Sequence, residues 1–176
     1  MVKKITSKQY LTSLEYYNLG ITQVYGDIAV FVNCPKLTHL ILDIPPSFTK
    51  LYGDISALSN LTELDTVYLC LPNVTGDIAA LTNATKLVYL RTNNSQVYGD
   101  ISTLANKPNL QILHLYDCPN LTGDIANLAS CTNLRYLTVN NTNVSGSVNN
   151  LANWSNLTHL QIYNTNKPGI CHVSSI

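Results

Sequence analysis

The sequence has little charge, no excess of either sign and no long apolar run. Ten basic and ten acidic residues cancel over 176 residues, and charged residues make up only 11% of the chain. Nucleic acids and anionic membrane surfaces attract a surplus of Lys and Arg, so we expect neither as the main partner. No segment approaches the roughly 18 consecutive apolar residues of a membrane span, so we also expect no membrane insertion.

The sequence also lacks the signs of an exported, disulfide-bonded protein. Residues 1–10 start with basic side chains but have no apolar segment after them, so we expect no export by a standard signal. Five cysteines without C-x-x-C spacing indicate neither a disulfide framework nor a zinc site. We interpret them as small apolar core residues, which favours a reducing cytoplasm; association with a virion or a cell surface is the alternative.

An internal repeat dominates the sequence. Gly-Asp-Ile recurs at Gly26, Gly53, Gly76, Gly99 and Gly123, and Gly146-Ser-Val is a degenerate sixth copy; the spacings are 27, 23, 23, 24 and 23 residues. Seven segments of the form L-x-x-L-x-L precede or follow these copies, and they begin at Leu14, Leu37, Leu64, Leu87, Leu110, Leu134 and Leu157. We therefore predict one domain over residues 1–176, with a half repeat at 1–13, seven repeats at 14–168 and a half repeat at 169–176.

Each unit predicts a short strand, a turn and a helical segment. The alternation in L-x-L is typical of a strand with one buried face, and strands that recur in one direction form a parallel sheet about 4.8 Å apart. An Asp before the short apolar segment is expected to cap a helical turn. These caps are Asp27, Asp54, Asp77, Asp100 and Asp124. We expect left-handed asparagines to close the same turns, at Asn33, Asn60, Asn83, Asn106 and Asn153.

This pattern resembles the leucine-rich-repeat family, and L-x-x-L-x-L followed by G-x-I is similar to the subclass common in plant receptors and some bacterial surface proteins. The resemblance implies an α/β solenoid. Its right-handed superhelix has a concave parallel sheet of about seven strands and short helical or 3-10 turns on the convex side. The chain departs from the family where Asn is usual, and we expect a looser turn there. The substitutes are Thr22, Pro72, Ser95, Cys118, Thr142 and Thr165.

Side chains between the buried leucines should project from the concave sheet. Tyr, His and Arg gather at these positions, where rigid rings and adaptable hydrogen-bonding groups are typical of a recognition surface. The predicted partner-binding residues are Tyr16, His39, Tyr68, Tyr89, Arg91, His114, Tyr116, Tyr136, His159 and Tyr163. Cys70, Leu71, Asn93 and Asn140 are also expected in exposed columns beside them.

We expect a non-catalytic scaffold that recognises a protein partner through this face. One alternative is a glycan-binding module, in which rings stack on sugars. Another is a structural module of a bacterial surface or phage assembly that self-associates through its ends. Val2, Ile5, Ile170, Val173 and Ile176 are candidates for that contact.

No catalytic residue, metal ligand or cofactor site is predicted. Cys70 and His39 should lie about 13 Å apart, and Asp43 beside Cys70 would raise the thiol pKa. His39, His114 and His159 fall on separate, distant strands. Calcium-binding repeat rolls have a nine-residue glycine-rich period that is missing here, and capping already accounts for each Asp.

Two further features stand outside the repeat consensus. Tyr25, Tyr52 and Tyr98 precede the glycines, and we interpret them as packing on one another at the rim. The insertion 44–50 contains Phe48, which either packs against a neighbouring repeat or contacts a partner.

Overall fold

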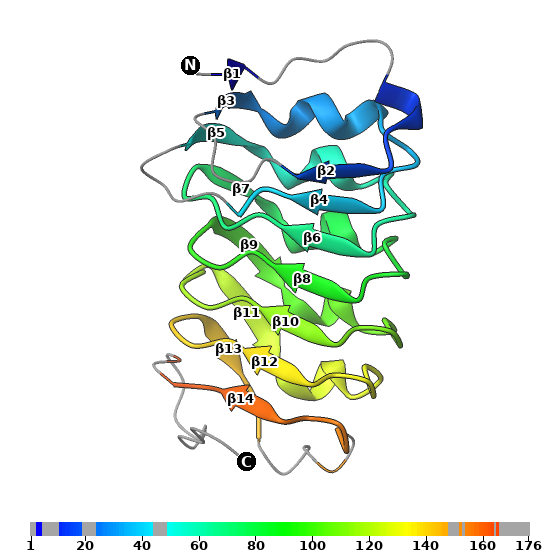
Figure 1. The fold of residues 1–176 in the computed structure, drawn as a ribbon. Helices are drawn as coiled ribbons and strands as arrows, with labels where there is room; N and C mark the ends of the chain where they lie inside the picture. Colours follow the sequence, from blue (N-terminus) through cyan, green and yellow to red (C-terminus); the bar gives the residue numbers. More distant parts are fainter. Residues whose placement is uncertain are drawn as a thin grey trace.

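The computed structural model describes residues 3–4, 11–18, 24–43, 49–147, 152, 154–163 and 165. Over these residues the chain forms a solenoid in which successive coils stack in sequence order, from β2 to β14 in Figure 1. The predicted half repeat 169–176, Cys171, Asn153 and the apolar end residues lie outside the described residues, as do positions 44–48 of the insertion.

The predicted concave sheet is confirmed, with seven parallel strands in the order of the repeats. We keep the name concave sheet for these strands: β2 Tyr16–Asn18, β4 His39–Ile41, β6 Thr66–Tyr68, β8 Tyr89–Arg91, β10 Ile112–His114, β12 Tyr136–Thr138 and β14 His159–Gln161. Their central residues point into the core, as the L-x-L alternation predicts: Leu40, Leu90 and Leu113 have no solvent exposure.

A second parallel sheet was not predicted. Its strands are β1 Lys3–Lys4, β3 Val24–Asp27, β5 Thr49–Asp54, β7 Val74–Asp77, β9 Gln96–Asp100, β11 Leu121–Asp124 and β13 Asn143–Ser145. They also pair in sequence order. The sequence pattern suggested a bend at each glycine, but Gly99 and Gly123 sit inside extended strands with φ of 106° and 110°. Such angles are open to glycine at little cost, so the strand continues through the residue.

Short 3-10 helices close each coil where the sequence predicted helical turns. They are η1 Leu11–Ser13, η2 Ile28–Asn33, η4 Ile55–Leu58, η5 Ile78–Leu81, η6 Ile101–Leu104 and η7 Ile125–Leu128. An Asp occupies the N-cap of η2 and of η4 to η7, and its Oδ1 accepts a hydrogen bond of 2.7 or 2.8 Å from the backbone N–H two residues later. Each cap thus satisfies an N–H group that the helix itself leaves unpaired.

The Gly-Asp pair couples each repeat to the next. A Cβ atom built on Gly99 would lie 2.3 Å from Oδ1 of Asp77 in the preceding repeat, and one on Gly123 would lie 2.3 Å from Oδ1 of Asp100. The capping carboxylate therefore occupies the space that a side chain would need. This contact explains why Gly and Asp recur together rather than separately.

A column of buried donors also joins successive repeats. Lys107 is fully buried, and its Nζ donates to the carbonyl oxygens of Leu81 (2.8 Å), Thr82 (3.1 Å) and Ala84 (3.2 Å). In the following repeats, Cys131 Sγ donates to Leu104 O and Trp154 Nε1 donates to Leu128 O. The donors reach back across one repeat to the end of the preceding 3-10 helix, where carbonyls lack helical partners.

The predicted turn asparagines need correction. Among the non-glycine residues described, the left-handed ones are Asn94, Asn106, Asp117 and Asn141, with φ between 55° and 60°. The prediction is therefore wrong for Asn33, Asn60 and Asn83. A 3-10 turn ends without a left-handed residue there, and three of the left-handed positions instead follow strands β8, β10 and β12 of the concave sheet.

Three of the residues that replace the family's asparagine, namely Ser95, Cys118 and Thr142, make specific contacts rather than a loose turn. Ser95 Oγ accepts from Val97 N–H (3.3 Å), and Thr142 Oγ1 accepts from Val144 N–H (3.3 Å). Cys118 Sγ donates to Thr92 O of the preceding repeat (3.0 Å). The Ser95 and Thr142 hydroxyls thus bond backbone groups within their own repeat, and the Cys118 thiol bonds one in the preceding repeat. These side chains take over the hydrogen-bonding role expected of an Asn side chain.

Candidate functional site

The register of the concave sheet brings the predicted residues onto one face. His114 on β10 pairs with Arg91 on β8 and with Thr138 on β12, and Ile112 pairs with Tyr89 and Tyr136 in the adjacent column. Since side chains alternate along a strand, both columns project from the same side. The inferred alignment of Tyr89, His114 and Tyr136 is therefore present in the fold.

At the N-terminal end of this face, the Tyr16 and His39 rings lie tilted against each other, with centroids 5.2 Å apart and an interplanar angle of 37°. His39 Nε2 lies 3.6 Å from Asp65 Oδ1, and His39 Nδ1 lies 2.8 Å from Thr38 Oγ1. Thr38 donates its only hydroxyl proton to Glu15 O (2.7 Å), so it must accept from His39 Nδ1. The imidazole therefore does not activate the Thr38 hydroxyl, although the three residue types resemble a hydrolase triad.

The centre of the face holds an Arg between an acid and a ring. Arg91 Nη1 lies 3.5 Å from Asp43 Oδ2, and the guanidinium carbon lies 5.1 Å from the centroid of the Tyr68 ring. The carboxylate offsets the charge, and the ring contributes a cation–π contact. Asp43 was predicted only as a neighbour of Cys70, so its pairing with Arg91 is new.

His114 lies beside Arg91 with tyrosines around it. Its ring centroid is 6.4 Å from that of Tyr116 and 6.5 Å from that of Tyr136. Burial, and secondarily the nearby Arg91 guanidinium, lowers the pKa of His114 below its ordinary value of 6.5. The imidazole is thus neutral at neutral pH and offers one donor and one acceptor.

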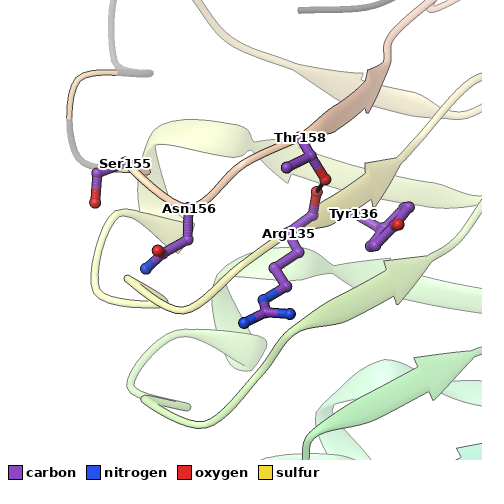
Figure 2. Close-up of a pocket in the computed structure, with 5 residues that line it drawn as sticks. All are labelled: Arg135, Tyr136, Ser155, Asn156 and Thr158. Atoms are coloured by element: carbon purple, nitrogen blue, oxygen red, sulfur yellow. Dashed lines mark hydrogen bonds between the residues drawn. The ribbon is translucent and has the colours of Figure 1, made fainter.

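The C-terminal part of the face contains a ring pair beside a shallow hollow. Tyr136 stacks on His159 with centroids 4.3 Å apart and an interplanar angle of 16°. The hollow, of about 380 Å³, is lined by Arg135, Tyr136, Ser155, Asn156 and Thr158 (Figure 2). Thr158 Oγ1 donates to Arg135 O (3.2 Å), which joins its two sides.

Sequence reasoning missed the polar residues of this hollow. Arg135 and Thr158 occupy the first exposed position of the L-x-x-L segment, but the prediction used only the second. Asp65, which contacts His39, occupies the same position in its own repeat. A polar residue there in several repeats was the available signal.

Four residues expected in exposed columns are buried instead. Cys70, Asn93 and Asn140 retain 7%, 4% and 4% of their exposure, and Leu71 retains none. Cys70 Sγ donates to Asn93 Oδ1 (3.2 Å). Burial first, and then Asp43, raises the pKa of Cys70 to about 12, so the predicted effect of Asp43 on the thiol is confirmed.

The tyrosines before the glycines lie on the second sheet and are exposed. Tyr25, Tyr52 and Tyr98 keep 39%, 52% and 45% of their exposure, so about half of each side chain faces solvent, and their packing on one another at the rim stays a prediction. Tyr89 on β8 is half-buried, and Tyr163, after β14, is exposed.

Over the described residues, His, Cys, Asp and Glu form no group of three or more arranged to hold a metal ion. In the same part of the chain, no helix has the length and apolar character required to cross a membrane.

Comparison with known proteins finds solved structures with a similar fold. No protein-family profile and no curated protein sequence matches the chain. The plant peptide hormone receptor RGFR1, solved in complex with RGF2, is 28% identical with a TM-score of 0.78, over 93% of this chain and 27% of the receptor chain. The leucine-rich-repeat ectodomain of the Arabidopsis thaliana receptor kinase GASSHO1/SCHENGEN3 was solved in complex with CASPARIAN STRIP INTEGRITY FACTOR 2. It is 26% identical with a TM-score of 0.75, over 94% of this chain and 20% of the receptor chain.

Internalin C2 from Listeria monocytogenes is 26% identical with a TM-score of 0.65, over 88% of this chain and 74% of the internalin. The plant and bacterial neighbours share stacked leucine-rich repeats, and this chain spans only a small part of the plant receptor chains. The chain has the fold of a leucine-rich-repeat solenoid.

Proposed function

We propose that the chain is a non-catalytic scaffold that binds a protein partner, presented as a linear peptide segment, through its concave sheet. The observation that carries the proposal is the register that aligns Tyr89, His114 and Tyr136 on one face of adjacent repeats. Tyr and Arg are enriched among residues that dominate binding energy: Tyr buries a large ring with few rotatable bonds, and Arg offers a planar fork of N–H donors.

The structural neighbours support a peptide or protein as the partner. Two plant receptors with 28% and 26% identity were solved with the ligands named above. The concave sheet of this chain has seven strands about 4.8 Å apart, so it extends roughly 30 Å and offers side chains along that whole length. Such a row suits a linear segment that crosses several repeats.

The test is a selection of displayed random linear peptides on the immobilised protein. The captured peptides should no longer bind the double variant Tyr89→Ala with Tyr116→Ala. They should be retained on the matched variant Tyr52→Ala with Tyr98→Ala, which removes two exposed rings from the second sheet. Circular dichroism checks that both variants keep the fold. Peptides that bind the first variant as well as the unchanged protein would refute the proposal, and so would a selection that yields none.

Glycan binding is the second candidate, because the stacked Tyr136 and His159 rings adjoin a hollow lined by amide, hydroxyl and guanidinium groups. Ring faces that stack on a sugar, with polar groups for its hydroxyls, would meet there. A glycan array should then give signals that Tyr136→Ala abolishes and that the Tyr52→Ala, Tyr98→Ala variant keeps. An array without any such signal would remove this candidate.

A further inference from the structure

The centre of the concave face contains buried polar atoms without hydrogen-bond partners. Within the described residues these atoms are Arg91 Nε, Thr92 Oγ1, both ring nitrogens of His114, Thr138 Oγ1 and Asn140 Oδ1. All except Thr92 Oγ1 belong to residues on the outward side of β8, β10 and β12 or just after β12. We call Arg91, His114, Thr138 and Asn140 the polar row.

The unpaired atoms of the polar row are shielded from water in this structure. Thr138 and Asn140 are only 7% and 4% exposed, and the ring nitrogens of His114 are fully covered. A buried polar atom without a partner bears the full loss of its hydration, and most buried polar groups in folded proteins therefore find a partner. Several such atoms side by side, on a face otherwise suited to binding, indicate bonds that a ligand would supply.

The charges of the row favour a neutral ligand group. Asp43 lies 3.5 Å from Arg91 and offsets its charge. His114 is uncharged at neutral pH, because burial and Arg91 lower its pKa. A carboxylate would meet no unbalanced cation, and an ammonium group would meet Arg91. The atoms without partners include both donors and acceptors, so the matching group must both accept and donate.

We propose that the polar row binds a side-chain carboxamide, from an Asn or Gln of a linear peptide. The oxygen of the amide would accept from His114 or Arg91, and its NH₂ group would donate to Thr138. A carboxamide has separate donor and acceptor atoms, which a single hydroxyl lacks, and it suits groups on strands about 4.8 Å apart. This inference rests on the proposed peptide-binding function.

The test starts from peptides selected on the unchanged protein as described above. At neutral pH, the peptides should share an Asn or Gln at one position. Replacing it with an apolar residue of similar size, Leu for Asn or Met for Gln, should weaken binding about tenfold or more. On the Thr138→Val variant the same replacement should have a much smaller effect, because the partner of the amide is already missing. Thr75→Val, an exposed change on the second sheet, serves as the control and should leave the full effect.

The outcomes separate this inference from the proposed function. Suppose that peptide binding needs Tyr89 and Tyr116, but that replacing a peptide Asn or Gln has the same effect on the unchanged protein and on Thr138→Val. That result would overturn the carboxamide subsite and leave the proposed function standing. A shared Asp or Glu whose binding tightens as pH falls would also overturn it, since that result indicates a carboxylate bound to protonated His114. Selected peptides that ignore the concave tyrosines would refute the proposed function itself.

Discussion

Lys107 ties two repeats together through its ammonium group. All three of its donors are used on carbonyl oxygens of the preceding repeat, at 2.8, 3.1 and 3.2 Å. In the same column the other repeats carry Cys34, Leu61, Ala84, Cys131 or Trp154, so Lys107 is the one charged residue among them. Burial lowers the pKa of Lys107 below its ordinary 10.5, which shows that the charge is held at a cost.

We predict that Lys107→Met lowers the free energy of unfolding by about 1–3 kcal/mol, because three buried carbonyls lose their donor. Urea denaturation measures the change. Lys86→Met is the control, since Lys86 is exposed and pairs with Glu63 at 2.6 Å on the surface; it should cost less than about 1 kcal/mol. A Lys107→Met protein that is more stable than the original would mean that the desolvation of the ammonium outweighs its hydrogen bonds.

Stability should also depend on the protonation of His114. Its folded pKa lies below 6.5, so between these two values the unfolded chain binds more protons and stability rises with pH. The contribution is complete above pH 6.5 and is lost as pH falls toward the folded pKa. Arg91 is the charged group that faces the imidazole, with Asp43 behind it and the Tyr116 and Tyr136 rings beside it.

Thermal unfolding between about pH 5 and pH 8 should therefore show a drop on acidification that is smaller in His114→Gln. The comparison removes the contribution of the other titratable groups, because both proteins share them. Equal pH profiles for the two proteins would contradict the assigned burial of His114.

The Gly-Asp-Ile segment explains how one element depends on the next. Asp77 caps η5 through Ala79 N–H and also fills the space beside Gly99 of the following repeat. Gly99 itself has φ of 106°, which a side chain would strain. The strand, the cap and the neighbouring strand are thus fixed by the same pair of residues.

Gly99→Ala should lower the free energy of unfolding by about 2–5 kcal/mol, from backbone strain together with the clash on Asp77. Asp77→Ala alone should cost about 1 kcal/mol through the lost cap. The double variant should lose less than the sum, because the clash disappears with the carboxylate. Chemical denaturation of all four proteins gives the coupling, and strictly additive losses would show that the two residues do not compete for space.

At the same scale, the leucine period predicted every concave strand and the Asp period predicted the 3-10 caps. The second sheet was missed because V-x-G-D contains glycine, which suggests a turn unless its φ is known. The register of the site was predictable, because equal spacing of Tyr89, His114 and Tyr136 within their repeats places them in line. Burial of Cys70 and Asn140 was not, since strand alternation alone places them on the outward side of the sheet.

Over the whole molecule, each repeat contacts its neighbours in sequence, so the proposed binding face exists only as an assembly of several repeats. Asp43, Tyr68, Arg91 and His114 come from four repeats, and none of these could form the centre of the face alone. The second sheet presents its own exposed tyrosines along the same stack. The molecule therefore offers two extended faces, of which the concave one contains the polar row and the paired rings.

The most direct test of the central claim is to map, by NMR, where a selected linear peptide contacts the folded protein. Binding through the concave sheet predicts shifts concentrated on outward residues of β8, β10 and β12, including Arg91 and His114, with little change on β7, β9 and β11. Shifts centred on Tyr52 and Tyr98 of the second sheet, with the concave strands unchanged, would contradict it.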